Sequence, residues 1–141
     1  MNSKLRNGVA LFGLLFGATL LITGSNWLLI PLINKPLVPL GSISTEIAFI
    51  CLSYLVMQFT SRKSGEQLGT FFKIAGTLSM VLSLAWLPLG RYLSGNWSNS
   101  FTNNSEASEI FWTFTYAVVA LPLLLLLLYL LYRLWVVLFR K

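Results

Sequence analysis

Four long apolar stretches constrain this chain of 141 residues more than any other feature of its sequence. A bilayer has a hydrocarbon core about 30 Å thick, so about 20 apolar residues in a helix are enough to cross it. We therefore expect an all-α integral membrane protein, in which four transmembrane helices form an antiparallel bundle. The bundle would be a single domain over residues 1–141. The predicted spans are residues 9–30, 43–60, 70–90 and 109–132.

These spans leave little room for any other kind of domain. The chain is 56% hydrophobic and 10% charged, whereas soluble domains have about 25% charged residues. The longest polar stretch is residues 91–108. A transmembrane β-barrel would need segments of about 10 residues with alternating hydrophobicity. The unbroken leucine run at residues 123–128 does not fit that pattern, and we expect its face to meet lipid or a large apolar partner.

The basic residues predict the orientation of the helices. If the N-terminus is cytoplasmic, residues 61–69 form an inner loop, and residues 31–42 and 91–108 form outer loops. The basic residues predicted to lie inside are Lys4, Arg6, Arg62, Lys63, Lys73, Arg133, Arg140 and Lys141, and those outside are Lys35 and Arg91. Basic residues concentrate on the cytoplasmic side of a membrane. We therefore predict that both termini are cytoplasmic, and we expect the inner membrane of a bacterium.

Aromatic residues at the ends of the spans agree with this orientation. Tryptophan and tyrosine favour the membrane–water interface, and Trp112 and Tyr132 are separated by about 30 Å of helix. The predicted interface anchors are Trp27, Trp86 and Trp112 at the outer side and Tyr132 and Trp135 at the inner side. The net charge of +6 is spread over short segments, which favours contact with anionic lipid and not with nucleic acid.

Small residues predict where helices pack closely. Gly13 and Gly17 are four residues apart in the first span, which also carries Gly24. We expect these glycines to face another helix of the same chain, and a dimer contact is the alternative. In the third span, Gly76, Ser79 and Ser83 share one helix face. We interpret that face as a packing surface, and a substrate path is the alternative.

The segments between spans provide the other candidate sites. Prolines in residues 31–42 predict an extended hairpin or a shallow re-entrant segment. Pro88 and Gly90 predict an end or a kink of the third span. Glu46 and Arg91 lie near the outer ends of two spans, where they either form an ion pair or extend separately to the headgroups. The candidate partner surface is Asn96, Trp97, Asn103 and Asn104.

The side chains needed for most enzyme chemistry are missing. The sequence has no histidine and no aspartate, and Cys51 is its single cysteine. A zinc site and a Ser-His-Asp triad therefore cannot be built. We expect no enzyme activity, no metal and no cofactor. The sequence favours a protein that binds another membrane protein, as an accessory subunit or an inhibitor or immunity-type partner. The alternative is a homo-oligomeric pore, channel or small-molecule carrier.

Overall fold

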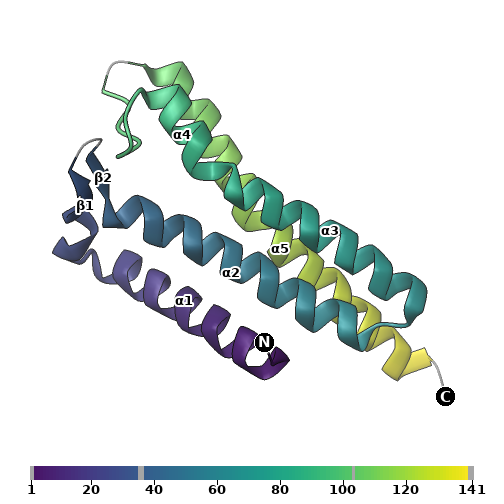
Figure 1. Cartoon of the computed structure of the whole chain (residues 1–141). Helices are drawn as coiled ribbons and strands as arrows, with labels where there is room; N and C mark the ends of the chain where they lie inside the picture. Colours follow the sequence, from purple (N-terminus) through teal and green to yellow (C-terminus); the bar gives the residue numbers. More distant parts are fainter. Residues whose placement is uncertain (1, 35–36, 103, 140–141) are drawn as a thin grey trace.

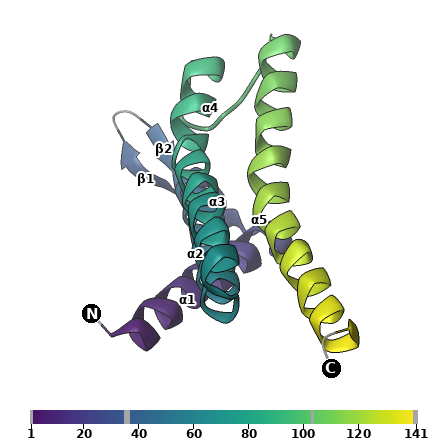
Figure 2. The ribbon, with the colours of Figure 1, turned by 90° about the vertical axis from the view of Figure 1, so that its right-hand side faces the viewer.

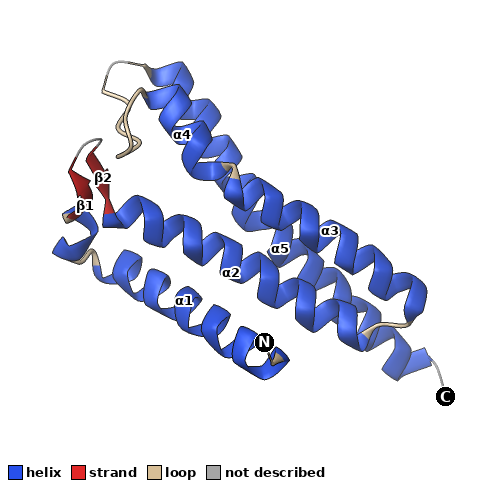
Figure 3. Ribbon diagram, in the orientation of Figure 1, coloured by secondary structure: helices blue, strands red, loops and turns tan. Residues whose placement is uncertain are grey.

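The computed structural model describes residues 2–34, 37–102 and 104–139, and it is mostly helical. Its long helices are α1 (Ser3–Thr23), α2 (Leu40–Lys63), α3 (Glu66–Leu84) and α5 (Ser105–Phe139). The short helix α4 (Trp86–Ser94) continues α3 after a break (Figure 3). With α3 and α4 taken together, four helices of the described residues are long and apolar enough to cross a membrane. The predicted helical fold and the number of candidate membrane-spanning helices are confirmed.

The long helices run alternately in opposite directions, and α2 packs against α1, α3 and α5 (Figure 1). The 3-10 helix η1 (Asn26–Leu29) and the strands β1 (Pro31–Asn34) and β2 (Leu37–Pro39) lie at one end, beside α4. We call this the hairpin end. Both termini and the α2–α3 turn lie toward the other end. Seen from the side, α1 and α5 diverge toward the termini (Figure 2), so α1 is attached to the other helices mainly through α2.

Two glycines of α1 set its contact with α2. A Cβ added at Gly17 would stand 2.8 Å from the carbonyl oxygen of Ser44 and 2.9 Å from the Cβ of Ala48. At Gly13 it would stand 3.0 Å from Cys51 Sγ. The spacing that predicted close packing therefore serves a contact within the chain. Gly24 does not: it ends α1 with a left-handed φ of 57° and has open space around it. The packing role predicted for Gly24 is wrong, because the helix ends there.

Proline explains the break between α3 and α4. Pro88 has no N–H to donate to the carbonyl of Leu84, and its ring crowds the preceding turn. The helix is interrupted at Ala85 and then continues to Ser94. The predicted kink is present, but the helix extends beyond Gly90. Gly90 lies directly against Asn99 and Phe111, which requires a residue without a side chain.

The predicted hairpin is also present. Strands β1 and β2 pair antiparallel, with Ile33 opposite Val38 and Asn34 opposite Leu37. A register shift occurs between Pro31 and Ile33, which is where proline cannot donate to the ladder. The hairpin leads directly into α2 and covers one side of the hairpin end.

Two apolar clusters hold α5 against the other helices. One contains Val56, Phe72, Leu125 and Tyr129 from α2, α3 and α5. The other, at the hairpin end, contains Trp86, Leu87 and Phe111. The leucine run is therefore not uniformly external as predicted. Leu125 is 4% exposed and Leu126 packs against the first cluster, whereas the other four leucines are about half exposed.

Candidate functional site

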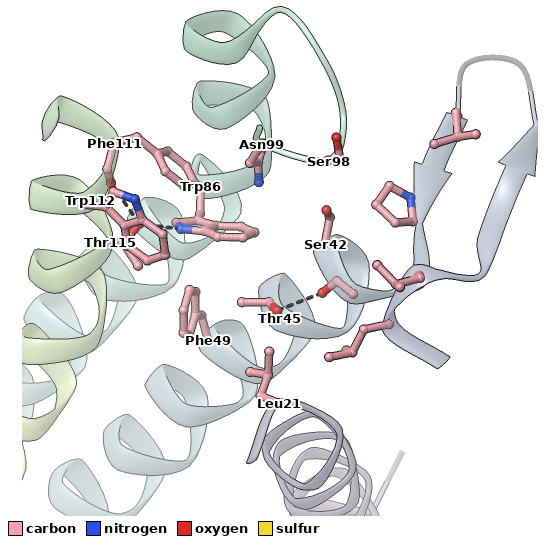
Figure 4. Close-up of a pocket in the computed structure, with 15 residues that line it drawn as sticks. Leu21, Ser42, Thr45, Phe49, Trp86, Ser98, Asn99, Phe111, Trp112 and Thr115 are labelled. Atoms are coloured by element: carbon pink, nitrogen blue, oxygen red, sulfur yellow. Dashed lines mark hydrogen bonds between the residues drawn. The ribbon is translucent and has the colours of Figure 1, made fainter. Parts of the chain in front are cut away.

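A cavity of about 530 Å³ lies at the hairpin end (Figure 4). It is formed where α1, η1, the hairpin and the first turns of α2 meet α4 and α5. This volume falls within the range of about 300–1,000 Å³ that is usual for small-molecule sites. Its apolar walls are Leu21, Leu28, Leu29, Leu37, Pro39, Phe49, Trp86, Phe111 and Trp112.

Trp86 is the central side chain of the cavity wall. Its indole N–H donates to Thr115 Oγ1 at 2.9 Å, and its ring meets the ring of Phe49 edge-on at 5.4 Å. It is only 6% exposed. The prediction of Trp86 as an interface anchor is therefore wrong, because the α3–α4 break places it between α2 and α5. Trp27, Trp112 and Trp135 are at least half exposed and Tyr132 is half-buried, so these four lie at the protein surface, and their role as interface anchors stays a prediction.

Three hydroxyl groups face the cavity, and each already donates its hydrogen bond to a backbone carbonyl. Ser42 donates to the carbonyl of Trp97 at 2.8 Å. Thr45 donates to the carbonyl of Gly41 at 2.7 Å, and Thr115 donates to the carbonyl of Phe111 at 2.8 Å. A hydroxyl oxygen has two acceptor sites. The oxygens of these residues therefore offer acceptors, not donors, to a molecule in the cavity.

Asn99 contributes an amide from the α4–α5 loop (residues 95–104). Its backbone has a φ of 53°, a left-handed conformation that asparagine tolerates better than most residues. Its Oδ1 is buried against Gly90 and has no hydrogen-bond partner among the described residues. The side chain points toward the cavity beside Trp86 (Figure 4). The buried Oδ1 can only accept, so the donor that Asn99 offers to the cavity is its side-chain nitrogen, which is drawn on the side of Trp86 (Figure 4).

The candidate partner surface proves to be occupied by contacts within the loop. Asn96 accepts from the backbone N–H groups of Ser98 and Ser100 and donates to the carbonyl of Ser94. Trp97 packs against the cluster of Trp86, and Asn104 accepts from the N–H of Ala107 at the start of α5. These three residues shape the loop and its junctions with α4 and α5. Asn103 lies outside the described residues.

Glu46 and Arg91 do not form the suggested ion pair in the described part of the chain, because each has a nearer partner. The Arg91 guanidinium donates to the carbonyl of Gly95 and lies 5.6 Å from the centre of the Trp97 ring. The Glu46 carboxylate lies near the backbone N–H of Leu87, at the beginning of α4. A carboxylate is favourable there, since the first N–H groups of a helix lack helical acceptors. The two residues therefore hold the hairpin end together separately.

The serines of α3 form a second polar cluster, closed inside the protein. Ser53 Oγ lies 2.9 Å from Ser79 Oγ and 3.2 Å from Ser83 Oγ. These three residues are at most 1% exposed. The neighbouring Gly76 lies against Met57, where an added Cβ would be 2.5 Å from the Met57 Cβ. These residues join α2 to α3, in agreement with the packing interpretation.

Most residues of the cavity could not be identified from sequence, because they come from segments as far apart as Leu21 and Thr115. No local sequence pattern marks Thr45 or Asn99 as a residue of a site. No group of histidine, cysteine, aspartate or glutamate side chains that could hold a metal occurs in the described ranges. No protein-family model matches the chain, and neither does any curated protein or solved structure.

Proposed function

We propose that this chain is a non-enzymatic integral membrane protein that acts by binding another membrane protein. It would be an accessory subunit or an inhibitor or immunity-type partner. The proposed setting is the inner membrane of a bacterium. There the helices would cross as an antiparallel bundle with both termini in the cytoplasm, in agreement with the excess of basic residues at that end.

The observation that carries this proposal is the free face of α1. Gly13 and Gly17 point to α2, while Gly8, Phe12 and Phe16 follow one another at four-residue intervals on another face. Phe12 is 71% exposed, and its ring stacks on Phe16 at 6.0 Å. A Cβ at Gly8 would meet nothing within 4 Å.

This face suits a transmembrane helix of a partner. Association of helices in lipid depends on close packing, because lipid tails are as apolar as leucine. Gly8 has no side chain and allows a partner helix to approach closely, and we call this position the notch. The stacked rings of Phe12 and Phe16 project beside it and offer a contact surface. The occupant we propose is therefore a helix of a different membrane protein.

Purification in mild detergent from the native host, followed by mass spectrometry, tests this function. The variant Gly8→Leu fills the notch and should reduce recovery of the partner at least tenfold, while the protein itself remains folded. Thr70→Leu, on the exposed side of α3, is the matched control and should not change recovery. If the same proteins are recovered from all three preparations, α1 is not the binding face.

The alternative function is a homo-oligomeric pore, channel or small-molecule carrier. Its proposed lining included Ser79 and Ser83, but their hydroxyls are buried and bonded to Ser53. Ionisable side chains that usually mark an ion path are concentrated toward the helix ends of this chain. We therefore expect no ion or solute flux from purified protein in liposomes. A selective flux that disappears in Ser79→Leu would favour the pore instead.

A further inference from the structure

The polar groups of the cavity at the hairpin end define the chemistry of a ligand. The oxygens of Ser42, Thr45 and Thr115 present acceptors, because their protons are donated to backbone carbonyls. The side-chain nitrogen of Asn99, which is a hydrogen-bond donor, points toward the cavity from the α4–α5 loop (Figure 4). A hydroxyl group can donate to an acceptor and accept from an amide at the same time. The site therefore suits a ligand with a hydroxylated polar end.

The lining also excludes a charged ligand. None of the residues around the cavity has a charged side chain. The nearby Arg91 guanidinium is engaged with the carbonyl of Gly95 and the ring of Trp97. A phosphate, carboxylate or ammonium group in this cavity would lose its hydration without gaining a counter-charge, which is strongly unfavourable. The ligand should be neutral.

The size and position of the cavity indicate a single apolar chain. A volume of about 530 Å³ holds on the order of 15–20 non-hydrogen atoms, at about 30 Å³ for a group the size of water. That is enough for a glycerol head and about the first ten carbons of one alkyl chain, and too little for two chains. Leucines of α1 and η1 line one side, whereas Ser98 and Asn99 of the α4–α5 loop line another. The apolar and polar sides are thus arranged as an amphiphile requires.

We propose that this cavity binds a neutral single-chain lipid alcohol of the monoacylglycerol type. Its hydroxyl groups donate to Ser42 and Thr45 and accept from the amide of Asn99. Its chain lies between Trp86 and the leucines of α1 and η1. This binding site is separate from the α1 face that carries the proposed function, so either can fail without the other.

Quenching of Trp86 fluorescence by a brominated lipid tests the site. Trp86 is retained as the single tryptophan, and phenylalanine replaces Trp27, Trp97, Trp112 and Trp135. The protein is placed in phosphatidylcholine vesicles that contain either a monoacylglycerol with a dibrominated chain or a phosphatidylcholine with the same dibrominated chains. Because Trp86 is 6% exposed, bulk lipid should quench it weakly. The monoacylglycerol should quench it strongly and saturably.

Variants of Thr45 make the test specific. Thr45→Val removes one acceptor and should weaken the apparent affinity about 3- to 10-fold, and Thr45→Phe should fill the cavity and abolish saturable quenching. Thr70→Val is the matched control, because Thr70 donates to the carbonyl of Glu66 four residues earlier, as Thr45 does to Gly41. It should bind as the parent does.

Three results would overturn the proposal. Equal, unsaturable quenching by both brominated lipids would mean that Trp86 senses only the bilayer. Unchanged quenching in Thr45→Phe would place the lipid elsewhere, and equal binding of a brominated lysophosphatidylcholine would refute the neutral ligand. Native mass spectrometry of the wild-type protein in detergent with monoacylglycerol provides an independent measurement. We expect one bound lipid per protein, and its absence also contradicts the proposal.

Discussion

The contact between α1 and α2 makes a quantitative prediction at Gly17. In an exposed part of a helix, glycine to alanine should stabilise the protein by up to about 1 kcal/mol, because alanine is the better helix former. At Gly17 the new methyl group would lie 2.8 Å from the carbonyl oxygen of Ser44 and 2.9 Å from the Cβ of Ala48. One neighbour is backbone and the other is a Cβ, so neither can rotate away. Overpacking of this kind costs about 1–3 kcal/mol.

Gly8 provides the reference for this measurement, since it lies in the same helix and has nothing within 4 Å of its Cβ position. Gly8→Ala should raise the free energy of unfolding slightly. Gly17→Ala should be about 1–3 kcal/mol less stable than Gly8→Ala, and that difference isolates the packing term. Both variants are measured by reversible unfolding in mixed micelles. If the two variants have equal stability, α1 does not pack on α2 through Gly17.

Three further substitutions test the interior, and a fourth, Leu124→Ala, is the exposed control. Ser53→Ala removes both hydrogen bonds to the α3 serines and should cost about 1 kcal/mol. Trp86→Phe keeps an aromatic ring but removes the donor to Thr115, and should cost about 1–3 kcal/mol. Leu125→Ala should cost about 2–5 kcal/mol, whereas Leu124→Ala should cost much less, because these residues are 4% and 53% exposed.

The same unfolding measurement checks all of these variants. Equal loss of stability in Leu125→Ala and Leu124→Ala would mean that α5 is rotated relative to the description above. A neutral Ser53→Ala would argue that the serine cluster is not buried. For Trp86, an additional readout is the emission maximum of its fluorescence in a protein with no other tryptophan. An emission maximum typical of water would contradict its burial.

The spans were predictable from sequence because the bilayer imposes a length and a composition that short windows record. The spacing of Gly13 and Gly17 and the prolines of residues 31–42 also predicted close packing and a hairpin. Each signal lies within a short stretch of sequence, whereas the residues that Gly17 contacts, Ser44 and Ala48, lie in the next helix. Gly24 was misassigned because glycine spacing alone does not distinguish a packing face from a helix C-terminus, where glycine adopts a left-handed conformation.

The cavity could not be predicted from the sequence, because it depends on which side chains at the ends of the helices face the interior of the protein. Trp86 has the composition of an interface anchor, and only the break at Ala85 turns it toward Thr115. Asn96 and Asn104 have the composition of a polar surface, yet their side chains are used in turns and caps. Asparagine serves both purposes. Tertiary contacts decide whether such a side chain is exposed or used inside the protein, and a local sequence pattern does not show these contacts.

In the proposed arrangement, four helices cross a bilayer with both termini on the cytoplasmic side, which places the hairpin end outside. Thiol labelling of intact cells tests this directly, in a background where Cys51 is replaced by alanine. A cysteine at Ser98, which is exposed in the α4–α5 loop, should react with a membrane-impermeant reagent. A cysteine at Ser64, in the α2–α3 turn, should react only after the membrane is permeabilised. Labelling of the cysteine at position 64 but not of the one at position 98 in intact cells would contradict the orientation. Labelling of both would contradict the prediction that the chain between them crosses the membrane.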